Sequence, residues 1–178
     1  MSRAAALALV TALAAACAPP GPPHPATGET RYLCCNLRYE KTAITDVNYQ
    51  VGTMIPVGTP VRITEAGRNR VTFEPEGHPP ITVVLQYGRN ALSFDEYLDR
   101  LLPREDPRRR MPSGETRTLI ETGMVEPGMT REQVIMSLGY PPAHRTPSLD
   151  ASTWTYWQNR WVTTVVAFDG NRVSRVVR

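Results

Sequence analysis

The chain has 178 residues, enough for one ordinary domain or two small ones, and its 41% hydrophobic and 21% charged residues are typical of a globular protein. The formal net charge is only +3, and the single run of basic residues, at 108–110, is too short to indicate a nucleic-acid partner. The 17 prolines concentrate at 18–26, 103–112 and 141–147, which are therefore predicted to connect folded parts.

Residues 1–16 have the layout of a secretory signal peptide, with Arg3, an apolar stretch at 4–13 and small residues before Cys17. About thirteen helical residues reach only ~20 Å, against ~30 Å for a bilayer core, so we expect no membrane span there. The sequence Ala-Ala-Ala-Cys at 14–17 resembles a bacterial lipobox, which implies that Cys17 carries acyl chains such as palmitoyl. The usual Leu stands one position early, at Leu13, so plain cleavage that leaves Cys17 unmodified remains an alternative.

Several acyl chains would hold the protein permanently on a membrane. Ala18 rather than Asp follows the cysteine, which by the sorting rule for bacterial lipoproteins implies the outer membrane, facing the periplasm. Residues 17–30 are then predicted to be a stiff, proline-rich tether between the membrane and the folded domains.

Between residues 31 and 87 apolar and polar residues alternate with period two, which predicts β-strands. The expected strands are 32–39, 59–65, 70–75 and 81–87, with a weaker one at 48–52. Such short strands predict a small, all-β, SH3-like barrel. A capping box at Ser93 and Glu96 begins a helix that runs to about Leu102 and is expected to close one end of this barrel, rather than to be an exposed docking helix. The first domain is therefore predicted at 31–102, followed by a linker at 103–112.

Residues 113–178 are predicted to form a second, two-layer α+β domain. A first helix is expected at 115–122, and a second begins at Thr130, whose side chain can form a capping box with Gln133. Three strands, at 152–158, 161–168 and 172–177, follow with turns so short that the sheet must be an antiparallel meander. Because an isolated helix of about nine residues is only marginally stable, the apolar face of this helix is expected to pack on the sheet.

The second domain also carries a set of short motifs. Their residues are Gly128, Met129, Thr130, Gln133, Val134, Gly139, Pro141, Trp154, Tyr156 and Phe168. This pattern resembles the SmpA/OmlA family of outer-membrane lipoproteins, the BamE-like domain, in which these are structural positions of an ααβββ fold. The resemblance implies a scaffold in outer-membrane protein assembly or envelope integrity, with the β-barrel assembly machinery as partner. The additional N-terminal domain departs from the family and could bring another partner.

Cys34 and Cys35 are adjacent on a predicted strand, so their side chains should point to opposite faces and not bond to each other. Two shielded thiols are expected, and an intermolecular disulfide or a redox-active pair are the alternatives. His24, His78 and His144 lie in proline-rich loops without the spacing of metal ligands, so each is predicted to be a solvated loop residue.

The sequence contains no nucleophile-elbow pattern and no phosphate-binding glycine loop. We therefore expect no enzyme, no cofactor, no metal and no small-molecule substrate. The predicted partner is an envelope protein.

If helices cover one face of the predicted sheet, Trp157 and Trp161 lie on the other. Two exposed tryptophans would mark a partner-binding surface, with the loop that carries Tyr140 and His144 beside it. The alternative is that the N-terminal domain covers these rings. The predicted function is a lipid-anchored envelope scaffold or binding module, and the alternative is a secreted or tethered inhibitor of a soluble enzyme.

Overall fold

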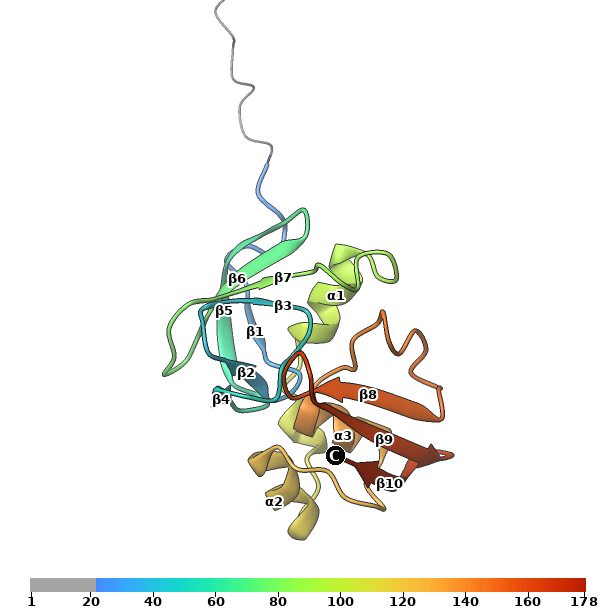
Figure 1. Cartoon of the computed structure of the whole chain (residues 1–178). Helices are drawn as coiled ribbons and strands as arrows, with labels where there is room; N and C mark the ends of the chain where they lie inside the picture. Colours follow the sequence, from blue (N-terminus) through green and yellow to red (C-terminus); the bar gives the residue numbers. More distant parts are fainter. Residues whose placement is uncertain (1–21) are drawn as a thin grey trace, which may run out of the picture.

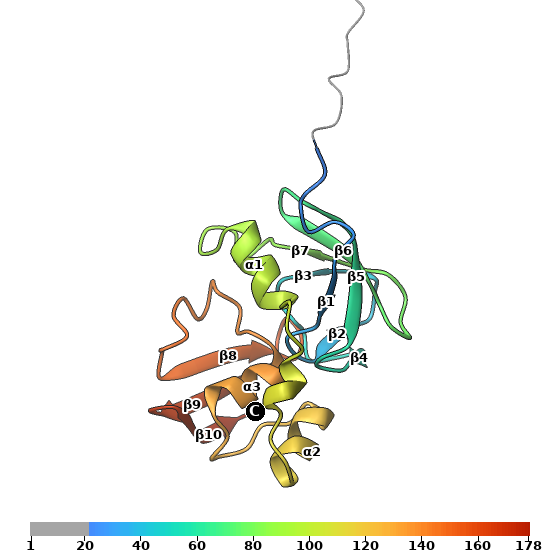
Figure 2. The ribbon, with the colours of Figure 1, turned by 180° about the vertical axis from the view of Figure 1, so that it is seen from behind.

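A computed structural model describes residues 22–178, so the predicted signal peptide and Cys17 lie outside the described residues. The described chain forms an N-terminal β domain and a C-terminal α/β domain. Figures 1 and 2 show the β domain at the end where the chain continues toward residues 1–21, and the α/β domain at the opposite end.

The β domain is built on a five-stranded sheet with the order β1-β5-β6-β7-β3, in which only β3 and β7 are parallel. A separate pair, β2 and β4, is antiparallel. The strands are β1 (Thr30–Tyr32), β2 (Leu37–Tyr39), β3 (Ala43–Thr45), β4 (Thr53–Ile55), β5 (Pro60–Gly67), β6 (Arg70–Pro75) and β7 (Ile81–Val84). Val71 and Phe73 on β6 are fully buried while their neighbours are not, because alternate side chains of a strand point to opposite faces.

Two of the predicted strands are wrong. The strand expected at 32–39 is interrupted, because the backbone bends at Cys34 and Cys35 and β1 and β2 belong to different sheets. The strand expected at 48–52 is absent. Its backbone turns toward the other domain, where Gln50 N donates to the carbonyl of Trp157 at 2.9 Å. The strand predicted at 70–75 is confirmed as β6.

Helix α1 (Phe94–Leu101) begins at the predicted capping box, in which Ser93 and Glu96 bond each other's backbone N–H. Leu98 and Leu101 are buried in the core of the β domain. The expectation that this helix closes the β domain, rather than being free for docking, is confirmed.

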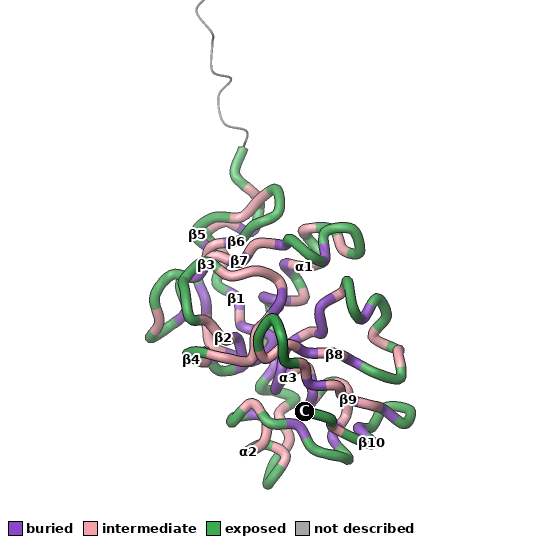
Figure 3. The backbone as a smooth tube through the Cα atoms, in the orientation of Figure 1, coloured by how far each residue is buried: buried purple, intermediate pink, exposed green. Residues whose placement is uncertain are grey.

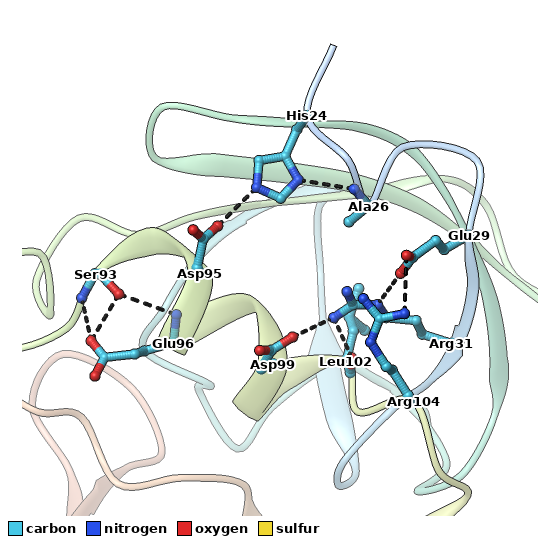
Figure 4. A network of polar contacts seen from close by, with 10 residues as sticks. All are labelled: His24, Ala26, Glu29, Arg31, Ser93, Asp95, Glu96, Asp99, Leu102 and Arg104. Carbon is cyan, nitrogen blue, oxygen red and sulfur yellow. Dashed lines mark hydrogen bonds and ion pairs between the residues drawn. The ribbon is translucent and has the colours of Figure 1, made fainter.

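The chain before β1 is fixed to α1, as Figure 4 shows. His24 Nε2 lies 2.8 Å from Asp95 Oδ1, and the buried guanidinium of Arg31 donates to Glu29 and Asp99 at 2.7 Å. The Arg31 guanidinium lowers the pKa of the Glu29 carboxyl. From His24 onward the predicted tether therefore contacts the β domain, with Ala26 buried and His24 only partly exposed.

The segment between the domains is ordered by a short 3₁₀ helix, η1 (Pro107–Arg110). Asp106 caps it by accepting from the Arg108 backbone N–H, and Arg108 hydrogen bonding lowers the pKa of Asp106.

In the α/β domain two helices pack on a three-stranded antiparallel sheet with the order β10-β9-β8, which confirms the predicted ααβββ arrangement. The α3 capping box between Thr130 and Gln133 is present. Trp154 and Tyr156 are fully buried, and the rings of Trp154 and Phe168 are 4.6 Å apart between centroids. The elements are α2 (Glu115–Thr122), α3 (Arg131–Leu138), β8 (Thr153–Trp157), β9 (Thr163–Asp169) and β10 (Arg172–Val177).

The two domains share a buried polar interface centred on Asn36, which is 1% exposed. Its backbone N–H donates to the carbonyl of Met136 at 3.0 Å, and its side-chain amide donates to the carbonyls of Ile120 and Ser137. The next carbonyl of α3, Leu138, accepts from the side chains of Asn48 and Gln50. The β domain therefore satisfies the last three carbonyls of α3, which a helix end leaves without partners of its own.

Val57 from the β domain completes this interface by packing into the core of the α/β domain, where it is 4% exposed. Figure 3 shows buried stretches inside both domains and an exposed turn between β8 and β9. Polar and apolar contacts thus hold the domains in one arrangement.

Candidate functional site

The β8–β9 turn presents the most exposed large hydrophobic side chain of the described residues. Trp161 is 79% exposed and its neighbour Val162 is 42% exposed. The side-chain oxygen of Asn159 accepts from the backbone N–H groups of both residues, at 2.8 and 3.0 Å, which fixes the turn. The sequence placed Trp161 on a strand. That is wrong, because these hydrogen bonds close the turn first and β9 begins at Thr163.

Trp157 lies at the other end of the same β8–β9 turn but has different surroundings. It is the last residue of β8 and is half-buried, with its carbonyl bonded to Gln50 of the β domain. Its indole N–H is buried without a partner among the described residues. Of the two alternatives for the tryptophans, exposure therefore describes Trp161, whereas partial cover by the β domain describes Trp157.

The two loop residues predicted for partner binding are also separated. The exposed His144 lies against Tyr87 of the β domain, with ring centroids 5.3 Å apart. Tyr140 instead packs against the core of the β domain, where the Arg100 guanidinium lies 5.5 Å from its ring centroid. Burial raises the pKa of Tyr140, and the positive charge of Arg100 works in the opposite direction. Tyr140 thus belongs to the contact between the domains.

A groove of about 400 Å³ runs between the domains beside the exposed turn. One wall comes from the β domain and the other from the α/β domain. The lining residues are Val47, Tyr49, Tyr87, His144, Arg145, Trp157 and Arg160. Of these residues only His144 and Trp157 could be predicted, because nothing in the local sequence of the others shows that these distant segments meet.

The family model of the outer membrane protein assembly factor BamE domain matches residues 114–177. The C-terminal domain is a BamE domain. The match confirms the resemblance inferred from the motifs, and the β domain lies outside it. No curated protein and no solved structure matches the chain.

The motif residues hold the BamE domain together. Gly128 has a φ of +95° and its carbonyl accepts from Arg172 at 2.7 Å, which joins the start of α3 to β10. Met129 and Val134 are buried in the core. Gly139 ends α3 with a φ of +87°, and a Cβ there would lie 3.0 Å from the side-chain nitrogen of Asn48. The BamE domain is therefore built directly against the β domain at this glycine.

The structure corrects the interpretation of the two adjacent cysteines. Cys34 and Cys35 are bonded to each other, and both are buried. The prediction of two unbonded side chains failed because it assumed a continuous strand, whereas the backbone bends here. The disulfide lines a second cavity, of about 140 Å³, together with Tyr97 and Tyr140. Burial raises the pKa of the Tyr97 hydroxyl well above its ordinary value, and the nearby Asp46 carboxylate adds to this.

Within residues 22–178, no three His, Cys, Asp or Glu side chains are placed to hold a metal ion. Over the same range no helix has the length and apolar character needed to cross a membrane. Among the features of residues 22–178, the turn with Trp161 and the adjoining groove combine exposed aromatic and basic side chains, which makes them the candidate binding site.

Proposed function

We propose that this protein is a non-enzymatic, lipid-anchored scaffold of the bacterial outer membrane that binds a component of the β-barrel assembly machinery. The BamE domain at 114–177 supports a role in outer-membrane protein assembly. The lipobox-like sequence before Cys17, after a signal peptide at 1–16, supports a lipid anchor. In this proposal residues 31–102 and 113–178 are the folded domains of a periplasm-facing protein.

The observation that carries the proposal is the exposure of Trp161 and Val162 on a turn fixed by Asn159. An exposed tryptophan on a rigid turn can be buried by a partner at little cost in conformational entropy. Burying a large aromatic side chain contributes on the order of 2–4 kcal/mol, and tryptophan is among the residues most enriched at the centres of interfaces.

The direction of the anchor fits this role. Pro22 lies five positions after Cys17, so an anchor would lie at most about 18 Å from Pro22. The described chain begins at the β-domain end of the molecule (Figures 1 and 2), which favours a BamE domain turned away from the membrane and toward periplasmic partners.

The proposal is tested by purifying the full-length chain, with a C-terminal tag, from crosslinked envelopes of its host. Components of the β-barrel assembly machinery are expected to co-purify with the wild type and to be lost with Trp161→Ala combined with Val162→Ser. The matched control is Met124→Ser, because Met124 is also 42% exposed but lies after α2. Recovery of a soluble enzyme in place of assembly components would favour the inhibitor function and overturn the proposal.

The anchor is tested separately by mass spectrometry of the native N-terminus. A diacylated or triacylated Cys17 is expected, and Cys17→Ser should release the protein from the membrane fraction. A mature chain with an unmodified N-terminal residue would show that the protein has no lipid anchor, and would overturn that part of the proposed function.

A further inference from the structure

The groove between the domains is lined by two arginines that have no ion-pair partner within residues 22–178. Arg145 and Arg160 form no ion pair and no side-chain hydrogen bond within this range, and none of the lining residues is Asp or Glu. Some exposed arginines are paired, such as Arg110 with Glu132 at 2.6 Å and Arg117 with Glu121 at 2.8 Å, whereas others, such as Arg175, are not. What distinguishes Arg145 and Arg160 is that both line the same groove.

Both guanidiniums are held by aromatic rings rather than by carboxylates. The Cζ atom of Arg145 lies 5.7 Å from the ring centroid of Trp157, and that of Arg160 lies 5.0 Å from the ring centroid of Trp161. A guanidinium positioned by a ring keeps its N–H donors available, and their fork matches the two oxygens of a carboxylate. The groove thus offers positioned carboxylate-binding groups beside the apolar surfaces of Tyr49 and Tyr87.

We propose that this groove binds an extended, acidic segment of the partner protein, with carboxylates at Arg145 and Arg160 and an apolar side chain between them. This inference rests on the proposed function, in which the chain binds an envelope protein, and adds the chemistry of the bound segment. The turn with Trp161 is then a second contact at the edge of the groove.

The shape of the site favours a peptide over other anionic partners. Nucleic acids are held by longer arrays of basic residues than two arginines and one histidine. A membrane surface requires cationic groups that protrude together, whereas this groove is a concave space between two domains. The Asn36, Asn48 and Gln50 contacts fix both walls before binding, so little free energy is spent on ordering the site.

The test is fluorescence anisotropy with the full-length protein in detergent micelles. The probes are a labelled peptide with glutamates on either side of one phenylalanine, and a twin in which every glutamate is glutamine. The glutamate peptide is expected to bind at least about tenfold more tightly than its twin, and its affinity should fall as salt screens the charges. Arg145→Gln and Arg160→Gln should each weaken binding about five- to tenfold.

Arg175→Gln is the matched control, because Arg175 is exposed and unpaired among the described residues but lies on β10. It should leave peptide binding unchanged. Equal binding of both peptides, binding of neither, or wild-type affinity in both groove variants would overturn the inference. It is also overturned if phosphatidylglycerol vesicles or a single-stranded oligonucleotide bind through these arginines while the glutamate peptide does not.

The two proposals can fail separately. Trp161→Ala should weaken peptide binding less than Arg160→Gln does, because Trp161 positions Arg160 but does not itself line the groove. If Trp161→Ala loses the envelope partner while Arg145→Gln retains it, the proposed function stands and the acidic-segment inference fails. If Arg145→Gln loses the glutamate peptide but no assembly component co-purifies with the wild type, the groove chemistry stands and the choice of partner fails.

Discussion

The two ends of helix α3 are stabilised in different ways. At its start, Thr130 and Gln133 form a cap from within the helix's own sequence. At its end, Met136, Ser137 and Leu138 give their carbonyls to residues of the β domain. Helix α3 therefore begins at a cap that its own sequence supplies, whereas its C-terminal end depends on hydrogen bonds from the neighbouring β domain.

Asn36→Leu should cause the largest loss of stability. The substitution removes three side-chain hydrogen bonds and leaves the Ser137 carbonyl and the Val57 N–H without partners in a buried site, while the Ile120 carbonyl keeps only its bond from the Gly123 N–H. We expect a loss of about 3–5 kcal/mol in the free energy of unfolding, measured by urea denaturation followed by circular dichroism. Asn90→Ala, at an exposed position, should change it by less than about 0.5 kcal/mol. A loss below about 1 kcal/mol for Asn36→Leu would show that the interface is not a major source of stability.

Gly139→Ala should have an intermediate effect at the same interface. Alanine is strained at a φ of +87°, and its Cβ would lie 3.0 Å from the side-chain nitrogen of Asn48. A loss of about 1–3 kcal/mol is expected from thermal and urea unfolding. Gly77→Ala is the matched control, because Gly77 has a φ of +76° but nothing within 4 Å of the added atom. Equal losses in both variants would mean that backbone conformation, and not contact between the domains, determines the effect.

Thr130→Ala should have a smaller effect, because it removes only the local cap of α3. The expected loss is about 1 kcal/mol in the free energy of unfolding. Thr130→Ser should recover most of it, since the serine hydroxyl can accept the same bond from Gln133. Failure of serine to recover stability would indicate that the methyl group of Thr130, rather than its hydroxyl, matters.

Glu29→Gln should have the smallest effect, and the effect should depend on pH. The Arg31 guanidinium lowers the pKa of Glu29 from its ordinary value of 4.5, so the folded state favours the ionised form. That contribution is present above pH 4.5 and is lost as pH falls through the lowered pKa of the folded state. The difference in unfolding midpoint between wild type and Glu29→Gln should therefore shrink between pH 7 and pH 3. Glu65→Gln, at an exposed position on β5, serves as control, and a difference that persists at pH 3 would exclude ionisation as the cause.

The features that could be predicted from sequence are those whose interactions are close along the chain. The capping boxes at Ser93 and Thr130 each join residues three positions apart, and both are present. The meander of β8, β9 and β10 follows from its short turns, and the burial of Trp154 and Tyr156 follows from alternation along one strand.

The candidate site was only partly predictable. Trp157, Trp161 and His144 could be named because they lie on one short strand, its turn and a nearby loop. Tyr87 and Tyr49 could not, because the groove forms only when distant segments are brought together. The parallel pairing of β3 with β7 escaped prediction for the same reason.

By itself, the sequence determined the elements with local hydrogen-bond and periodicity signals, and the BamE motifs that depend on them. Tertiary structure alone decided that Cys34 bonds Cys35, that Asn36 supplies partners to two helix ends, and that Arg145 and Arg160 face a groove without a carboxylate. The physical reason is the separation along the chain between the residues that interact. A cap or a strand face is set by neighbours a few residues away, whereas a buried polar contact or a groove depends on where segments far apart in the chain come to lie.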